Sequence, residues 1–316
     1  MLIPFTAPYD LRGTLCGGQA FRWREEDDGW FCGVIFGNVV RMRRVDEGIE
    51  FVSAPDDETS LAPLVRDYLR VDDDMDEVYA ALSEDEHLSD AVKQHRGLRV
   101  LRQEPWECLV GFICSANNNI PRITANVEDM ALHYGSSLPG HDLLASANGD
   151  GDGLQGCERN VFPTARQLVD AGEQALRDLK LGFRAVNVIA AAEGIVEGEG
   201  PDLYSLREAD YEDALAELVK LRGIADKVAN CVMLFSLDKP QAFPVDVWIV
   251  KAMRDWYPDA PVPPALNSNG NKTTPTEKHK REMREWALER YGKHAGYANQ
   301  YMFHHKRWVD LVRDSG

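Results

Sequence analysis

Short apolar runs separated by turn-forming residues fill the first third of the chain. Two acid-flanked helices are predicted over Leu61–Leu69 and Met75–Leu82, and Gly37-Asn38 is predicted to form a hairpin turn before them. The runs with the composition of β-strands are Phe21–Trp23, Trp30–Phe36 and Val39–Arg43. Residues 1–97 are therefore expected to form a small α/β domain built on an antiparallel sheet.

From about residue 98 the apolar residues recur with the three-to-four-residue spacing of helices. The predicted helices are Trp106–Ser115, Arg122–Tyr134, Thr164–Ala171, Glu173–Leu179, Ala185–Glu197, Tyr211–Lys220, Lys227–Leu237, Val247–Trp256 and Glu277–Phe303. The last is expected to break at Gly292 or Gly296, and Pro261–Pro275 is expected to form a surface loop. Residues 98–316 are therefore predicted to form a mostly helical body, which places the chain in the α+β class.

The segment Ser146–Gly156 is rich in glycine and aspartate. Asn148, Asp150 and Asp152 alternate in it as in a calcium-binding EF-hand loop. Arg159 stands where that motif needs a bidentate glutamate. A solvated surface loop is therefore the favoured interpretation, and calcium binding is the alternative.

The formal net charge is −17, from 52 acidic and 35 basic residues. This excess argues against a nucleic-acid partner, because DNA-binding domains usually carry a basic patch. The acidic residues are concentrated in runs such as Asp72-Asp73-Asp74 and Glu84-Asp85-Glu86, which are typical of a solvated surface. At about 1 M salt the Debye length is only ~3 Å, so an acidic protein can still hold DNA through direct contacts. We therefore expect a protein of a high-salt cytoplasm, as in a halophilic archaeon, with an ordinary acidic cytosolic protein as the alternative.

No segment predicts export or a membrane span. Met1–Leu11 lacks a basic stretch followed by an apolar run, and the most apolar stretch, Cys231–Leu237, is too short to cross a bilayer. The six cysteines include no CxxC pair and no spacing typical of zinc or iron–sulfur sites. The sequence thus predicts a cytoplasmic protein with reduced cysteines and no membrane partner.

A helix, a tight turn and a second helix occupy residues 211–237. The first helix is expected to be capped by Asp210, and Gly223 lies in the turn, where it permits backbone conformations that a side chain forbids. A turn that leads into a helix N-terminus presents unpaired N–H donors, which form an anion site suited to DNA phosphate. Any helical hairpin could have such a turn, so this feature alone does not identify a function.

The residues after the turn carry a specific resemblance. Lys227 opens the second helix, and Asp246 follows within Phe243-Pro244-Val245-Asp246-Val247-Trp248. This arrangement resembles the HhH-GPD superfamily of DNA glycosylases, and the lysine resembles its bifunctional glycosylase/lyases. Further segments resemble the eukaryotic-type 8-oxoguanine DNA glycosylase family: Gly18-Gln19-Ala20-Phe21-Arg22-Trp23, Leu101-Arg102-Gln103-Glu104-Pro105, Phe112-Ile113-Cys114-Ser115-Ala116-Asn117-Asn118-Asn119-Ile120, Leu181-Gly182-Phe183-Arg184 and Ala295-Gly296-Tyr297-Ala298.

This resemblance implies a two-lobed helical body with the active site between the lobes, and a catalytic pair. Lys227 is the expected nucleophile, whose neutral amine attacks the sugar C1′ and forms a Schiff base before β-elimination cuts the strand. Burial and the helix N-terminus favour the neutral amine. Asp246 is the expected carboxylate that stabilises the developing sugar cation, and it is also a natural cap for the next helix.

The resemblance also implies a pocket for a flipped base. Cys231 and Phe303 are expected to sandwich the base, and the Gly18 carbonyl to accept the N7 proton that 8-oxoguanine has and guanine lacks. The expected base-pocket residues are Gly18, Cys231, Phe235, Asn299, Gln300 and Phe303. The family has glutamine where Asn299 falls, so either Asn299 or the adjacent Gln300 is expected to contact the base. The charge state of the Lys227–Cys231 pair is also open, because the implied thiolate–ammonium pair conflicts with a neutral lysine.

DNA contacts are implied for further residues. Asn117 is expected to fill the space of the flipped base, and Arg122 and Arg184 are expected to read the opposite cytosine. The expected DNA-binding residues are Asn117, Asn118, Arg122, Phe183, Arg184, Gly223, Ala225 and Trp248, the last standing where relatives have histidine. The backbone carbonyls of Val219, Leu221 and Ile224 resemble a structural cation site.

The sequence therefore predicts a base-excision repair enzyme that excises 8-oxoguanine opposite cytosine in double-stranded DNA and then cleaves the strand. We expect a monomer without a catalytic cofactor. Two alternatives remain. An alkylpurine DNA glycosylase uses water and lacks the hairpin lysine, so Lys227 counts against it. A non-catalytic helix-hairpin-helix DNA-binding protein has no need of Lys227 together with Asp246.

Overall fold

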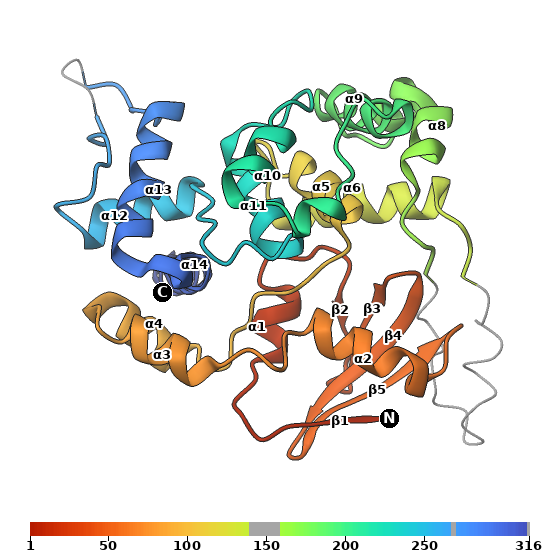
Figure 1. Cartoon of the computed structure of the whole chain (residues 1–316), viewed down its shortest axis with the longest axis horizontal. Helices are drawn as coiled ribbons and strands as arrows, with labels where there is room; N and C mark the ends of the chain where they lie inside the picture. The colour runs from red at the N-terminus through yellow and green to blue at the C-terminus, as the bar shows by residue number, and fades with distance from the viewer. Residues whose placement is uncertain (139–158, 267–269, 315–316) are drawn as a thin grey trace.

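A five-stranded antiparallel sheet forms the N-terminal part of the computed structural model, which describes residues 1–138, 159–266 and 270–314. The strand order is β1-β5-β4-β3-β2, and α2 lies along the sheet, whereas α3 and α4 lie away from it (Figure 1). The elements are β1 (Leu2–Pro4), α1 (Leu11–Cys16), β2 (Arg24–Glu25), β3 (Phe31–Ile35), β4 (Asn38–Val45), β5 (Gly48–Ala54), α2 (Glu58–Tyr68), α3 (Met75–Leu82) and α4 (Glu86–Gln94).

The hairpin between β3 and β4 turns one residue earlier than the sequence predicts. Ile35 pairs with Asn38, so the two turn residues are Phe36 and Gly37, whose φ angles are +44° and +81°. Two consecutive left-handed residues match the twist of the flanking strands. The strand predicted over Phe21–Trp23 is also wrong, because the pairing there is limited to β2, two residues opposite β3.

The remaining elements are helical. They are α5 (Pro105–Cys114), α6 (Ile120–Tyr134), α8 (Ala165–Asp178), α9 (Arg184–Glu197), η1 (Ser205–Arg207), α10 (Tyr211–Leu218), α11 (Asp226–Ser236), α12 (Val247–Trp256), α13 (Glu277–Tyr291), η2 (Gly292–His294) and α14 (Ala295–Asp314). The predicted split at residue 172 appears as a kink in α8, where Gly172 has φ +80°. The predicted break in the last helix falls at Gly292, and Gly296 lies inside α14.

Two large hydrophobic clusters among the described residues hold the fold, beside a small third one around Val34 and Leu138, and the two large clusters do not divide at residue 97. The sheet cluster contains Leu15, Phe51 and Val65 and also Leu101. The helical cluster contains Leu82 of α3 and Leu88 of α4 together with α11 and α14. Helices α3 and α4 therefore precede the predicted domain boundary but pack within the core of the helical body. The amphipathic faces of α3 and α4 are the reason, since each is buried against the later helices rather than against the sheet.

The helical body forms two groups (Figure 1). Helices α12, α13 and α14 lie together with α3 and α4, while α5, α6 and α8 to α11 form the other group. The segment predicted as a loop over residues 146–156 lies outside the described residues, and 261–266 has no helix or strand. Within the described ranges, none of the helices has the length and apolar character to cross a membrane.

Candidate active site

Lys227 lies in the first turn of α11, where the sequence places the nucleophile. Its Nζ donates a hydrogen bond to Ser115 Oγ at 2.7 Å and lies 5.2 Å from the centre of the Phe112 ring. Ser115 ends α5, and its own hydroxyl donates to the Phe112 carbonyl at 2.6 Å. The sequence places Ser115 in the asparagine-rich motif without indicating a role for it. In the structure its hydroxyl holds the lysine amine in place.

Asp246 caps α12, as the sequence predicts. One carboxylate oxygen accepts hydrogen bonds from the backbone N–H groups of Trp248 and Ile249, each at 2.9 Å. Burial raises the pKa of this half-buried carboxyl, while the charge of Lys227 and the two N–H donors lower it. The Asp246 carboxyl is therefore near enough to Lys227 to be influenced by its charge, in a site where burial already disfavours the ionised carboxylate.

Cys231 follows Lys227 by one turn of α11 and is 3% exposed. Burial raises the pKa of its thiol to about 11, although the nearby Lys227 amine lowers it. At neutral pH the protonated thiol is therefore favoured over the thiolate. In this unbound state the structure favours a neutral Cys231 over the thiolate–ammonium pair that the resemblance implies.

Gly18 brings the N-terminal domain into contact with the helical body. Its φ is +102°, and a Cβ there would lie 2.5 Å from Ile120 Cδ1 and 3.6 Å from Phe303 Cε1. A side chain would therefore be strained and would collide with α6. The backbone of Gly18 lies against Phe303 of α14, which is the juxtaposition that the predicted base pocket requires.

The asparagine turn follows Ser115 and exposes Asn117, whose φ is +49°. Arg184 donates to the carbonyls of Ala116 and Asn117 at 2.8 and 2.7 Å. Arg184 is 3% exposed, so in this structure it holds the turn instead of presenting its guanidinium to DNA. Phe183 is 52% exposed beside it, with the Arg184 guanidinium 4.6 Å from its ring centre.

Other predicted residues of the turn keep different contacts. Asn118 Nδ2 donates to the Cys114 carbonyl at 2.9 Å, which closes the turn on α5. Arg122 is exposed, and its contact with the Lys180 carbonyl is long at 3.4 Å. Of the two predicted arginines, Arg122 is therefore the more accessible to a DNA ligand.

The helical hairpin has an open N-terminus. Gly223 has φ +81°, and a Cβ there would lie 2.3 Å from Asn187 Cγ of α9, so only glycine fits the turn. Helix α11 begins after Ala225 without a side-chain cap, which leaves its first N–H groups free for a ligand. The predicted cap of α10 differs, because Asp210 occupies the N-cap position without a capping hydrogen bond.

An ion pair anchors the start of α11 in this hairpin. Asp226, next to Lys227, pairs with the buried Arg284 of α13. Asn230 donates to the Asp226 carbonyl at 2.9 Å and accepts from Tyr211 OH at 2.7 Å. These contacts fix the start of α11, and they neutralise an acidic side chain that would otherwise oppose phosphate.

The comparisons with known proteins agree with this arrangement. Residues 2–109 match the family model of the 8-oxoguanine DNA glycosylase N-terminal domain. The chain is 34% identical to the N-glycosylase/DNA lyase OGG1 of Arabidopsis thaliana over 301 residues, which cover 90% of this chain and 74% of the relative. The chain belongs to the OGG1 family of N-glycosylase/DNA lyases.

Two further similar proteins cover nearly the whole chain. A probable N-glycosylase/DNA lyase of Methanothermobacter thermautotrophicus is 30% identical, over 99% of this chain and 97% of the relative. The 8-oxoguanine glycosylase/lyase of Clostridium acetobutylicum, solved with double-stranded DNA containing cytosine opposite 8-oxoguanine, has a TM-score of 0.80. It is 28% identical and covers 98% of both chains. The predicted fold class, with a small antiparallel sheet before a two-lobed helical body, is confirmed.

Asn299 and Gln300 make different hydrogen-bond contacts in this OGG1-family chain. Asn299 Nδ2 donates to the Pro244 carbonyl at 3.0 Å, which ties α14 to the segment before Asp246. Gln300 is 2% exposed, and its Nε2 has no hydrogen-bond partner among the described residues. Which of the two contacts a base stays a prediction.

Two other predicted residues lie at the edges of the site. Phe235 is buried, and its ring stacks on Phe112 with the centres 5.4 Å apart, so it supports the residue beneath Lys227. Trp248 lies just beyond Asp246, and Lys251 Nζ is 4.2 Å from its ring centre. This contact places a cation beside the Asp246 cap of α12.

Gln19 is a site residue that sequence reasoning missed, although it stands in a quoted motif. It is 1% exposed. Its Nε2 donates to the carbonyls of Thr14 and Arg99 at 2.9 and 2.8 Å, and its Oε1 accepts from the Leu101 N–H at 2.8 Å. The three bonds join α1 to the segment before α5 and hold Gly18, the preceding residue. The sequence shows only a glutamine directly after a glycine pair, and its burial and its contacts are visible only in the structure.

Gln19→Leu is expected to lower the free energy of unfolding by roughly 2–5 kcal/mol, because three buried backbone groups lose their partner. Urea denaturation followed by circular dichroism measures this loss. Gln174→Leu is the matched control, since Gln174 is exposed on α8 and, of the residues that the structure describes, its side chain bonds Asp178 alone. Equal midpoints for both variants would contradict the anchoring role of Gln19.

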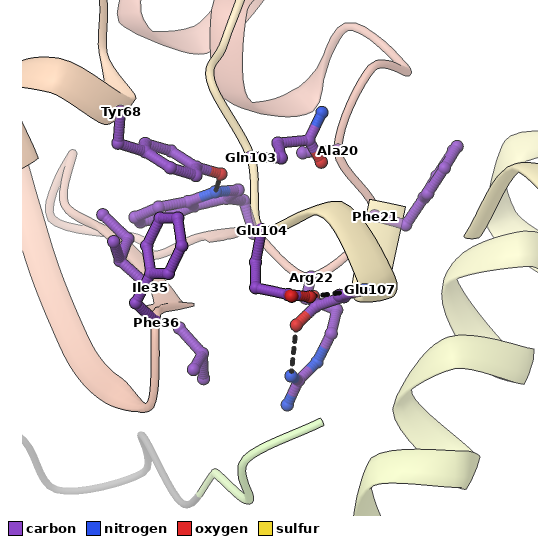
Figure 2. Close-up of a pocket in the computed structure, with 11 residues that line it drawn as sticks. Ala20, Phe21, Arg22, Ile35, Phe36, Tyr68, Gln103, Glu104 and Glu107 are labelled. Carbon is purple, nitrogen blue, oxygen red and sulfur yellow. Dashed lines mark hydrogen bonds and ion pairs between the residues drawn. The ribbon is translucent and has the colours of Figure 1, made fainter. Parts of the chain in front are cut away.

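A small cavity lies beside this anchor, where the sheet meets α5 (Figure 2). Arg22 approaches Glu107 across it, with Nη1 and Oε2 3.4 Å apart. Burial raises the pKa of Glu107 to about 7, against the lowering effect of Arg22. The residues that line this cavity include neither Lys227 nor Cys231, so it is separate from the predicted base pocket.

Proposed function

We propose that this OGG1-family chain excises 8-oxoguanine from duplex DNA through a Schiff base on Lys227 and then cleaves the strand. The observation that carries the proposal is the position of the Lys227 amine. It is held by Ser115 at the N-terminus of α11, close enough to Asp246 and Cys231 to change the pKa of both. Gly18 and Phe303 lie against each other and supply the facing parts of a base pocket.

The chemistry follows from these groups. The neutral Lys227 amine attacks C1′, the bond from C1′ to the base nitrogen breaks, and its electron pair leaves with the base, which takes up a proton. The lysine nitrogen loses its proton, and the sugar ring opens to a Schiff base as O4′ is protonated. Removal of the C2′ proton then expels the 3′ phosphate oxygen and cuts the strand.

Asp246 stabilises the positive charge that develops on the sugar while the base departs. Its two N–H contacts aim the carboxylate, and they occupy only one of its oxygens. The second oxygen stays available to the sugar or to a proton in transit. The cap that fixes α12 therefore also orients the catalytic carboxylate.

Recognition of the lesion and of duplex DNA is assigned to two groups of residues. The Gly18 carbonyl accepts the N7–H of 8-oxoguanine, which guanine lacks, while Cys231 and Phe303 contact the faces of the base. The exposed Asn117 and Phe183 enter the DNA duplex, and Arg122 reads the opposite cytosine. The free N–H groups around Gly223 and Ala225 bind phosphate.

The hairpin carbonyls of Val219, Leu221 and Ile224 form a donor set of neutral oxygens, which suits a hard monovalent or divalent cation. The Leu221 carbonyl also accepts the Ile224 N–H at 3.1 Å, so the turn is already shaped without an ion. Such a cation would stabilise the turn that binds phosphate. We propose no cofactor for the chemical steps.

We further propose that the enzyme works as a monomer in a high-salt cytoplasm, in association with DNA. The open helix N-terminus and the short-range contacts above do not depend on long-range attraction. The net charge of −17 would repel DNA at low salt.

Excision is therefore expected to rise with potassium chloride and to persist at about 1 M, where the Debye length is ~3 Å. The measurement is the initial rate of 8-oxoguanine release across a salt series. An ordinary DNA-binding protein weakens steeply between about 50 and 200 mM salt. Loss of activity over that range would contradict the high-salt assignment without touching the proposed chemistry.

The proposed function is tested with three duplexes, which carry 8-oxoguanine opposite cytosine, guanine opposite cytosine, or 3-methyladenine opposite thymine. Release of 8-oxoguanine with strand cleavage is expected, with little release of the other two. Release of 3-methyladenine without strand cleavage would instead assign an alkylpurine glycosylase. Binding to all three duplexes without release of any base would assign a non-catalytic module.

A further inference from the structure

Arg307 on α14 reaches three parts of the active site. It follows Phe303 by one turn, and its guanidinium carbon lies 5.8 Å from the centre of the Phe303 ring. Its Nη1 donates to the Gly17 carbonyl at 3.2 Å. Its charge also lowers the pKa of Asp246, against the effect of burial. A single side chain thus connects the glycine loop, the base-facing ring and the catalytic carboxyl.

The glycine loop that Arg307 contacts is fixed on its other side by Gln19. Gly17 packs directly on α14, because a Cβ there would lie 3.2 Å from His304 Nδ1 and 2.1 Å from the Gly13 carbonyl oxygen. Two consecutive glycines would otherwise leave the backbone unusually free. Gln19 restrains the loop from the N-terminal domain, and Arg307 restrains it from the helical body.

The bond to Gly17 also determines where the next carbonyl points. The Gly17 carbonyl and the Gly18 N–H belong to one planar peptide group, so a hydrogen bond to the oxygen fixes the plane. The φ of +102° at Gly18 then places the carbonyl carbon of Gly18 relative to that plane, so the position of its carbonyl group depends on how the Gly17–Gly18 peptide is held. A small rotation of the Gly17–Gly18 peptide would move that carbonyl away from a flipped base.

We propose that Arg307 is a positioning residue for lesion recognition, which holds the Gly17–Gly18 peptide against α14 so that the Gly18 carbonyl meets N7–H of the flipped base. The inference rests on the proposed excision of 8-oxoguanine. In this proposal Arg307 acts on recognition of the base and not on the chemical steps at the sugar. An abasic site has no base to recognise, so its cleavage needs Lys227 and Asp246 but not the Gly18 carbonyl.

The test compares Arg307→Leu with wild type under single-turnover conditions on two duplexes, one with 8-oxoguanine and one with an abasic site opposite cytosine. Excision of 8-oxoguanine is expected to fall by roughly 10- to 100-fold, as misplaced binding groups typically cause. Cleavage of the abasic site is expected to change by less than about 3-fold, because the catalytic pair stays in place. Arg307→Lys keeps a cationic donor and is expected to restore part of the excision rate.

Arg66→Leu is the matched control, since Arg66 lies on α2 and, among the described residues, its side chain pairs with Asp72 alone, at the surface. Equal losses on both duplexes would overturn the inference and would indicate that Arg307 acts through Asp246 or through folding. Unchanged excision in Arg307→Leu would overturn it as well. Wild-type protein that cleaves abasic DNA but leaves 8-oxoguanine in place would instead refute the proposed function, on which the inference rests.

Discussion

Lys227→Gln is expected to abolish both 8-oxoguanine excision and strand cleavage, with a loss on the order of 10³-fold or more in the single-turnover rate. The amide cannot attack C1′ or form a Schiff base. Glutamine is a good helix former of similar length, and it can still donate to Ser115 Oγ, so α11 should keep its structure. Single-turnover assays at saturating enzyme separate the loss of chemistry from any loss of binding.

Lys93→Gln is the control for this variant, because Lys93 is exposed on α4 and pairs with Asp90 alone within the described part of the chain. Its rates should match those of wild type. DNA affinity of Lys227→Gln, measured by fluorescence anisotropy on the 8-oxoguanine duplex, should stay within a few-fold of wild type. Undiminished base release by Lys227→Gln would show that water is the nucleophile, and would favour the alkylpurine-type mechanism.

Asp246→Asn is expected to reduce the excision rate by roughly 10²–10³-fold, the usual cost of losing one preorganised electrostatic group. Asparagine is as good an N-cap as aspartate, so the two hydrogen bonds that start α12 should survive. Burial raises the pKa of Asp246, so the folded state binds its proton more tightly than the unfolded state does. The protein therefore loses stability as the pH rises through the raised pKa and Asp246 ionises. Removing the charge should therefore not lower the melting temperature at neutral pH.

The pH profile gives a second readout of the same residue. Because the pKa of Asp246 is raised, acidification should protonate its carboxylate before the pH reaches the ordinary titration range of aspartate. The wild-type rate should therefore begin to fall at a pH above that range. This acid limb should be absent in Asp246→Asn. Asp57→Asn is the matched control, because Asp57 caps α2 through the same pair of N–H bonds at the surface. An Asp246→Asn enzyme with the wild-type rate and acid limb would reduce Asp246 to a structural cap.

The helical part of the fold was accessible from the sequence because its elements are long and amphipathic. Even the kink at Gly172 and the break at Gly292 follow from glycine within helical patterns. The sheet was harder to predict. Strand β2 has only two residues, and the turn at Phe36-Gly37 places a bulky residue in a left-handed conformation that local propensity disfavours. The packing of α3 and α4 on the helical core depends on tertiary contacts that periodicity does not specify.

Some residues of the site could be predicted from the sequence, and others could not. Lys227 and Asp246 could be named because the hairpin and the segment that ends in Asp246 resemble a known glycosylase superfamily, and each residue lies at a predicted helix start. Ser115, Gln19 and Arg307 could not, because their roles come from contacts between segments far apart in the chain. The buried guanidinium of Arg184 was also beyond sequence reasoning, since its donors are directed to carbonyls of the asparagine turn.

The most direct test of the central claim is borohydride trapping on an 8-oxoguanine:cytosine duplex, with wild type and Lys227→Gln compared in molar salt. Borohydride reduces a Schiff base to a stable covalent bond between protein and DNA. We predict a trapped adduct with wild type, mapped to Lys227 by peptide mass spectrometry, and none with Lys227→Gln. Base release by wild type without any adduct, or an adduct that persists in Lys227→Gln, would contradict the role of Lys227 as nucleophile.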